Sequence, residues 1–200
     1  MPTNGQNGVP EPSGIPSNGI SSTPVRPVRI AIIGGGIAGS AAALSLTRLP
    51  DVHVKVYERA PAIREAGAQI ALMVSAMKTL HRMLSPKAFT ELERNMFRAD
   101  GADGIHHRHW RSGEVLATNI SPHTPRRLQE GRTSRVVLHR VLMRDVPESV
   151  VEYGKEFVRV QTYTTTAGHK KALLHFKDDS TVTADLVIAA DGLYSVSYTI

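Results

Sequence analysis

Three glycines follow a short apolar segment at the spacing G-x-G-x-x-G. The segment, Val28–Ile33, is rich in β-branched residues, which is typical of a strand buried on both faces. Gly34, Gly36 and Gly39 come directly after it. In this pattern the first glycine permits a tight turn, the second lets the backbone approach a pyrophosphate, and the third allows a helix to pack closely on the strand. The pattern predicts a dinucleotide at a helix N-terminus, where free N–H groups favour phosphate.

The residues after the glycines complete a strand–helix–strand unit. Small apolar residues over 38–49 predict a helix, which Pro50 ends because proline cannot continue it. Residues 53–57 alternate in polarity and predict a second strand that ends at Glu58. Glu58 lies 24 residues after Gly34, close to the offset of roughly 20 residues expected of the carboxylate that binds the ribose hydroxyls. The unit predicts an α/β fold of Rossmann type with a mostly parallel sheet, and by itself leaves NAD and FAD open.

The loop after Glu58 points to FAD through a resemblance. Residues 59–61 read Arg-Ala-Pro, and residues 67–70 read Gly-Ala-Gln-Ile. These segments resemble the FAD-dependent aromatic hydroxylases, single-component flavoprotein monooxygenases that include salicylate hydroxylase-like enzymes. The family has Arg-Ala-Pro after its ribose-binding glutamate and then a Gly-Ala-Gly-Ile turn, so Gln69 is a departure, and Ala71 stands where a glycine is common. The resemblance implies that Arg59 and Ala71 belong to the cofactor site.

A predicted helix over 138–146 carries a second part of the resemblance. Leu138 and Val141 belong to an apolar face at helical spacing, whereas Arg140 and Arg144 share the opposite face at i, i+4. Spacing alone favours a solvated basic face. The resemblance is to a family helix that begins with a His-Arg pair, and it implies that the Arg140 guanidinium contacts FAD while Arg144 stays at the surface.

An apolar strand predicted over 186–190 ends in Asp191 and Gly192. An Asp-Gly pair after a strand is in isolation usually a turn. However, the carboxyl ends of parallel strands also present ligand sites. The pair resembles the family's second fingerprint, which implies that Asp191 and Gly192 contact FAD and the pyridine nucleotide. The implied cofactors are FAD and, as co-substrate, NAD(P)H.

The middle of the chain predicts β structure without a metal. His106, His107 and His109 lie close together in a segment that alternates in polarity, and His107 and His109 would share a strand face. No carboxylate or cysteine at suitable spacing completes a ligand set, so we expect a polar sheet face and no metal. We expect a small β-rich insertion at about residues 100–130. Two alternating runs between 157 and 183 predict a hairpin around residues 177–180.

Composition bounds the compartment and the partners. Residues 1–27 consist largely of Gly, Pro, Ser, Asn and Thr, which predicts a disordered tail before an FAD-binding domain over 28–200. The tail lacks the pattern of a secretion signal or a transit peptide, and no apolar run approaches the roughly 20 residues of a membrane span. The net charge of +6 suits a pyrophosphate, and no nucleic-acid-binding motif accompanies it. The chain has no cysteine, which fits a reducing, cytoplasmic location.

The resemblance implies an enzyme that hydroxylates an aromatic or polyketide-like small molecule with NAD(P)H and oxygen. It covers residues 28 to about 197 of this chain but only about the first half of a typical family member, so we expect an incomplete, truncated FAD-binding domain. No residue is nominated as a catalytic acid or base. Two alternatives stay open at this point: a non-catalytic remnant of such an enzyme, and an NAD-dependent dehydrogenase.

Overall fold

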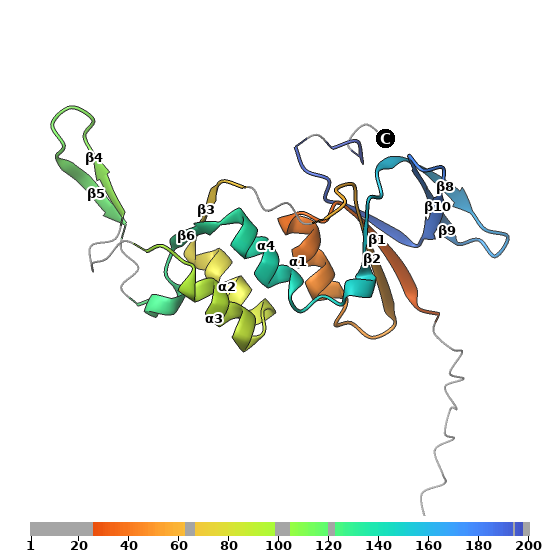
Figure 1. Cartoon of the computed structure of the whole chain (residues 1–200), viewed down its shortest axis with the longest axis horizontal. Coiled ribbons are helices and arrows are strands. Elements are labelled where there is room, and N and C mark those ends of the chain that lie inside the picture. The colour runs from red at the N-terminus through yellow and green to blue at the C-terminus, as the bar shows by residue number, and fades with distance from the viewer. Residues whose placement is uncertain (1–25, 63–66, 99–104, 120–122, 194, 198–200) are drawn as a thin grey trace, which may run out of the picture.

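The fold is organised around a parallel sheet of four strands, which lies in the right-hand part of Figure 1. The computed structural model describes residues 26–62, 67–98, 105–119, 123–193 and 195–197, so most of the predicted tail (residues 1–25) lies outside the described residues. The strand order is β11 (Leu186–Ala189), β1 (Val28–Ile33), β2 (Val52–Glu58) and β7 (Val151–Tyr153), with every neighbouring pair parallel. This order confirms the predicted α/β fold of Rossmann type.

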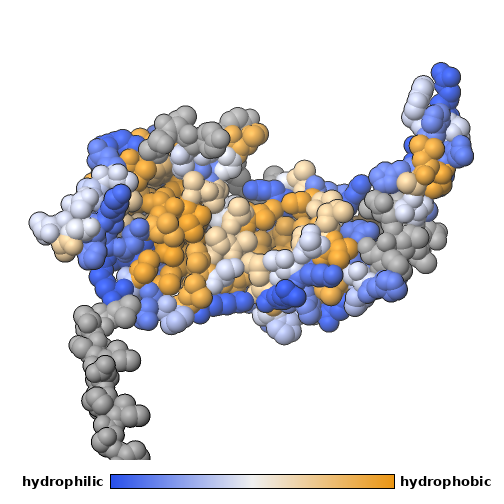
Figure 2. Space-filling model, turned by 180° about the vertical axis from the view of Figure 1, so that it is seen from behind, coloured by the Kyte–Doolittle hydropathy of each residue, from blue (hydrophilic) through white to orange (hydrophobic). Residues whose placement is uncertain are grey.

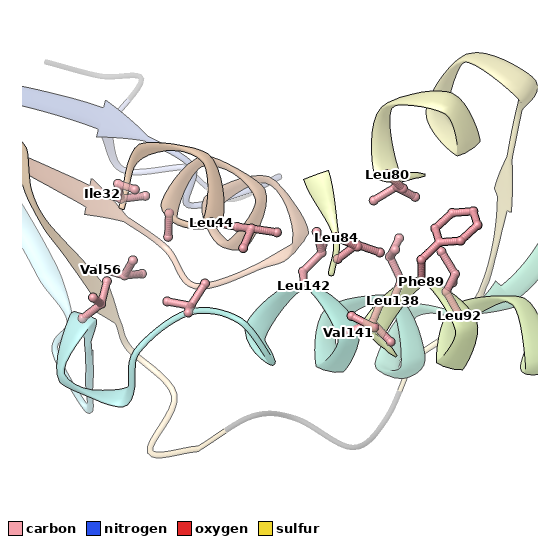
Figure 3. Packing of buried hydrophobic residues seen from close by; sticks show 14 of the residues in the cluster. Ile32, Leu44, Val56, Leu80, Leu84, Phe89, Leu92, Leu138, Val141 and Leu142 are labelled. Atoms are coloured by element: carbon pink, nitrogen blue, oxygen red, sulfur yellow. The ribbon is translucent and has the colours of Figure 1, made fainter. Parts of the chain in front are cut away.

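One face of this sheet is covered by α1 (Ile37–Leu46), which packs on β1 and β2. α4 (Arg135–Met143) packs on α1, and α3 (Pro86–Arg94) packs on α4, with α2 (Val74–Met83) beside α3 and farther from the sheet (Figure 1). Ile30 and Ile32 of β1 belong to the apolar core on the helical side, whereas Ala31 and Ile33 belong to a second core on the other side. Figure 3 shows the helical core, in which side chains of α3 lie beside those of α4. The period of two along β1 thus supplies both cores from a single strand.

An antiparallel sheet of three strands covers the other face. It consists of β8 (Phe157–Thr164), β9 (Lys170–Phe176) and β10 (Thr181–Ala184), in the order β10-β9-β8. The Phe176 ring lies on Tyr57 of β2, with ring centroids 4.8 Å apart. The hairpin predicted around residues 177–180 is confirmed by the pairing of β9 with β10, and β8 adds a third strand. Because both faces of β1 are covered, the expectation of a strand buried on both sides is also confirmed.

Two strand pairs and two short 3-10 turns complete the described elements. β3 (Gln69–Leu72) pairs antiparallel with β6 (Gly131–Ser134). β4 (Ile105–Arg108) and β5 (Val115–Asn119) form a hairpin that projects from the body in Figure 1, within the range of the expected β-rich insertion. The 3-10 turns are η1 (Arg126–Leu128) and η2 (Glu148–Val150). Seen from behind, hydrophobic residues gather across the middle of the molecule (Figure 2), so part of its apolar surface faces solvent.

The helix boundaries differ from the prediction in one way that affects the site. The helix predicted from residue 138 begins three residues earlier, at Arg135. The reason is the Ser134 hydroxyl, which accepts a hydrogen bond from the Val136 N–H and so caps the helix. Apolar periodicity alone therefore placed the start of α4 wrongly. Within the described residues, no helix is both long and apolar enough to cross a membrane.

Candidate dinucleotide-binding site

The glycine turn joins β1 to α1 at the carboxyl edge of the parallel sheet. Gly34 has φ +97°, a conformation that L side chains rarely adopt. Its N–H donates to the Tyr57 carbonyl at 2.8 Å. A Cβ at Gly34 would lie 2.5 Å from the Ala190 carbonyl oxygen at the end of β11. Both the backbone conformation and the close approach of β11 therefore require glycine at this position.

The other two glycines of the pattern have opposite surroundings. A Cβ at Gly39 would lie 1.9 Å from the Gly34 carbonyl oxygen, because α1 packs directly on the turn. At Gly36, the residue that precedes α1, the nearest atom to an added Cβ is a guanidinium nitrogen of Arg135 at 3.9 Å. Gly39 is therefore needed for packing, whereas Gly36 leaves a space open above the start of the helix.

Glu58 lies beside this turn at the end of β2. One carboxylate oxygen, Oε2, accepts a hydrogen bond from the Gly35 N–H at 2.7 Å, and the other, Oε1, accepts one from the Ala60 N–H at 2.8 Å. Each oxygen can accept a further hydrogen bond, since an ionised carboxylate offers about four lone-pair sites. The backbone thus fixes a half-buried acceptor next to the glycines, as a ribose-binding carboxylate needs.

Asp191 has much of its hydrogen-bonding capacity used by its own loop. Its carboxylate accepts the Ser195 hydroxyl at 2.8 Å, the Val196 N–H at 2.8 Å and the Ser197 N–H at 3.1 Å. Burial raises the pKa of Asp191, but the hydrogen bonds from Ser197 and Ser195 outweigh it, so the pKa lies below its ordinary value. Gly192 follows with φ +83°. These contacts show a turn-forming role for Asp191, and a contact with a cofactor stays a prediction.

The turn, Glu58 and Asp191 surround one cavity of about 160 Å³. Ligand pockets usually enclose about 300–1,000 Å³, so this cavity suits a part of a dinucleotide. A smaller hollow of about 80 Å³ adjoins it and shares Glu58 and Asp191. The residues that line the main cavity come from the ends of β1, β2, β7 and β11 and from α4: Gly34, Gly35, Gly36, Glu58, Arg59, Ala60, Ala62, Arg135, His139, Tyr153, Ala190, Asp191 and Gly192.

Two residues predicted from the resemblance lie away from this cavity. Arg140 is in the last turn of α4 with an exposed side chain, and Ala71 is exposed on β3, opposite Arg132 of β6. Gly39 lies beneath the turn rather than in the cavity wall. The structure brings together the remaining predicted residues, namely Gly34, Gly36, Glu58, Arg59, Asp191 and Gly192.

The cavity also contains two residues of α4 that were not predicted. Arg135 is the first residue of the helix, and His139 follows one turn later on the same face. The signal that would have identified them is Ser134, a favoured N-cap residue. The arginine that the structure places at the cavity is therefore Arg135, and the expected contact of Arg140 with a cofactor has no support in the geometry.

The charged residues around the cavity are two arginines and two carboxylates, those of Glu58 and Asp191. Arg59 and Arg135 line it, and neither makes an ion pair with a carboxylate of the described residues. His139 is buried, and its Nε2 donates to the Gly35 carbonyl at 2.6 Å. Burial lowers the pKa of His139 and outweighs the hydrogen bond to Gly35, which raises it; Arg135 lowers the pKa further and Glu58 opposes this with a smaller effect. At the other end, burial and the Glu58 carboxylate raise the pKa of Tyr153.

A larger and shallower hollow of about 650 Å³ lies beside α3. Its cationic residues include Arg144, which is paired with Glu91. The adjacent N-terminus of α3 is already capped, because the Ser85 hydroxyl accepts the Ala88 N–H. Arg94 also lines this hollow, but the hollow lacks the open helix amides of the glycine-turn cavity.

Comparisons with known proteins agree with this site. Residues 32–70, which hold the glycines and Glu58, match a family model described as an NAD(P)-binding Rossmann-like domain. The chain is 33% identical over 172 residues to 6-hydroxynicotinate 3-monooxygenase of Pseudomonas fluorescens, covering 84% of this chain and 41% of that protein. It is 31% identical over 176 residues to an FAD-dependent monooxygenase of Aspergillus terreus, covering 86% and 39%. A salicylate hydroxylase solved with its substrate superposes with a TM-score of 0.66 at 28% identity, covering 84% and 37%.

The chain matches the N-terminal part of the FAD-dependent aromatic monooxygenases. It spans about 40% of the length of these relatives. The resemblance inferred from the sequence is therefore confirmed over this part.

Proposed function

We propose that this chain binds FAD at the glycine turn and forms the FAD-binding part of a monooxygenase that hydroxylates a small aromatic molecule with NAD(P)H and oxygen. The observation that carries the proposal is the open space at Gly36, where an added Cβ meets nothing nearer than Arg135 at 3.9 Å. A glycine kept for packing alone would be crowded, as Gly39 is. The matches to flavin monooxygenases support FAD as the dinucleotide.

The residues of the cavity divide the work of holding the cofactor. The N–H groups at the start of α1 have no acceptor within the helix, so they are free for the pyrophosphate. Arg135, and on the other side Arg59, add positive charge and hydrogen-bond donors. Glu58 accepts the ribose hydroxyls. Bound FAD would supply the electron transfer from NAD(P)H and the reaction with oxygen, while these residues bind and orient it.

The substrate class and compartment belong to the same proposal. The relatives include proteins named for 6-hydroxynicotinate, 6-methylsalicylate and salicylate, all small aromatic acids, which supports an aromatic substrate. The absence of cysteine supports a cytoplasmic location.

The test is a binding and turnover assay on the purified 200-residue chain. We expect it to bind FAD in preference to NAD, seen as a flavin absorption band that stays with the protein through desalting. NADH and NADPH oxidation is then followed with added FAD and with salicylate and 6-hydroxynicotinate as probes. Retention of FAD without turnover identifies a binding part that needs further polypeptide for catalysis. Binding of NAD and not FAD would refute the proposal and favour an NAD-dependent dehydrogenase. That alternative agrees with the matched family model, which is described as NAD(P)-binding.

A further inference from the structure

The Gly35 peptide is held from both sides by side chains. Its N–H donates to Glu58, whereas its carbonyl oxygen accepts two hydrogen bonds, from the Ser40 hydroxyl at 3.1 Å and from His139 Nε2 at 2.6 Å. Ser40 is completely buried and His139 is 9% exposed. Both donors are buried, and together they fix the orientation of the Gly35 carbonyl; His139 also borders the cavity.

The direction of this carbonyl sets the direction of the next amide. In a trans peptide the C=O and the following N–H point in opposite directions, because the unit is planar. With the Gly35 carbonyl turned toward Ser40 and His139, the Gly36 N–H points away from them. A Cβ added to the same residue meets nothing nearer than a guanidinium nitrogen of Arg135 at 3.9 Å, so a ligand can approach the Gly36 backbone closely.

The peptide between Gly35 and Gly36 needs such a restraint. Glycine has no Cβ and adopts a wide range of φ and ψ, so a peptide flanked by two glycines can rotate at little steric cost. Rotation would turn the Gly36 N–H inward and present a carbonyl oxygen to the cavity. A carbonyl oxygen repels phosphate, so the orientation of this one peptide decides whether the turn attracts or repels an anion.

We propose that His139, assisted by Ser40, is a positioning residue that holds the Gly35–Gly36 peptide with its N–H presented to the pyrophosphate of the bound dinucleotide. The inference rests on the proposed function and deepens it, since it assigns to α4 a part in building the phosphate site. His139 contacts the turn and acts through it. The hydrogen bond spans 104 residues of sequence, so it also fixes α4 against the β1–α1 turn.

The chemistry of the contact determines which substitutions test it. The Gly35 oxygen can only accept, so Nε2 of His139 carries the proton in the neutral ring. Glutamine places an amide N–H at a similar distance from the backbone and retains the donor. Leucine fills the space and offers none. His139→Gln and His139→Leu therefore separate the hydrogen bond from the packing.

The experiment measures the affinities of FAD, ADP and adenosine for the full chain by calorimetry. ADP contains the pyrophosphate and adenosine lacks it, so adenosine reports on the rest of the site. For His139→Leu we expect FAD and ADP to bind about tenfold more weakly, the effect of one lost hydrogen bond of ordinary strength, with adenosine unchanged. His139→Gln should bind all three as the unsubstituted chain does. His53→Leu, an exposed histidine on β2, is the matched control and should change nothing.

The outcomes separate this inference from the proposed function. If the unsubstituted chain binds neither FAD nor ADP, the proposed function fails. If it binds them and His139→Leu binds ADP equally well, or loses ADP and adenosine to the same extent, the inference is overturned. Should His139→Leu not fold, Ser40→Ala decides in its place, because it removes the second donor and leaves His139: a selective loss of ADP affinity supports the inference, and unchanged ADP affinity overturns it.

Discussion

Two alanine substitutions in one turn should have opposite consequences. Gly39→Ala would place a methyl group 1.9 Å from the Gly34 carbonyl oxygen and 3.1 Å from its carbonyl carbon. Real Cβ contacts are essentially never shorter than 3.0 Å, so α1 would have to move away from β1 by about 1 Å or more. Gly36→Ala adds a methyl group whose nearest neighbour, a nitrogen of Arg135, is 3.9 Å away. The same chemical change is therefore blocked at one position and accommodated at the other.

The magnitudes follow from these contacts. Forcing extra atoms into a packed core costs typically about 1–3 kcal/mol, and the clash at Gly39 is with backbone, which cannot rotate aside. We expect Gly39→Ala to lower the free energy of unfolding by about 3 kcal/mol. At Gly36, φ is −70°, which alanine adopts readily. Alanine stabilises the fold because it restricts the unfolded chain, but it destabilises the helix because it is a poorer N-cap than glycine. Each effect is worth up to about 1 kcal/mol, so the free energy of unfolding should stay within about 1 kcal/mol of the original value.

Binding should change in the other direction. The methyl group of Gly36→Ala occupies the space where the pyrophosphate approaches the backbone, so FAD affinity should fall by at least about tenfold, or about 1.4 kcal/mol. Urea unfolding followed by circular dichroism measures the stability, and quenching of flavin fluorescence measures the affinity. Equal destabilisation by the two substitutions, or unchanged FAD binding by Gly36→Ala, would refute the assignment of one glycine to packing and the other to the ligand.

Two further predictions concern α4. Arg135→Ala should weaken FAD binding by about tenfold or more, since a charge-assisted hydrogen bond is worth about 1.5–3 kcal/mol. Arg140→Ala on the same helix should leave FAD binding unchanged, and a titration that gives the reverse order would contradict the proposed role of Arg135 in the cavity. Burial lowers the pKa of His139 below 6.5. Just below that pH the unfolded chain therefore binds more protons than the folded chain. The free energy of unfolding should accordingly decrease as the pH falls through about 6.5. Urea unfolding at several pH values should show a smaller decrease for His139→Gln, and an identical decrease would mean that this histidine is not the group responsible.

The parts of the fold that the sequence predicted have local signals. β1 and the strand that ends at Ala189 are short apolar runs, and the glycine spacing marks the turn between β1 and α1. Glu58 was identifiable because a strand precedes it at a suitable distance from Gly34. Each of these predictions needed only the neighbouring residues.

The features that the sequence did not predict depend on contacts between residues distant in sequence, or on a helix-capping residue. The pairing of β8 with β9 and its packing on Tyr57 cannot be read from alternation alone, because any alternating strand has an apolar face. The contact of His139 with Gly35 spans 104 residues, and no spacing rule indicates it. The start of α4 at Arg135 has a local signal in Ser134, a favoured helix cap, and the contact of Arg140 with FAD stays a prediction.

Mapping the FAD site on the protein in solution tests the central claim most directly. The amide resonances of the ¹⁵N-labelled 200-residue chain are followed while FAD is added. We predict that the largest shifts occur at Gly35, Gly36 and Ile37 and at residues 58–60, where the turn and the carboxylate meet the cavity. Shifts confined to the hollow beside α3, or no shifts at saturating FAD, would contradict an FAD site at the glycine turn.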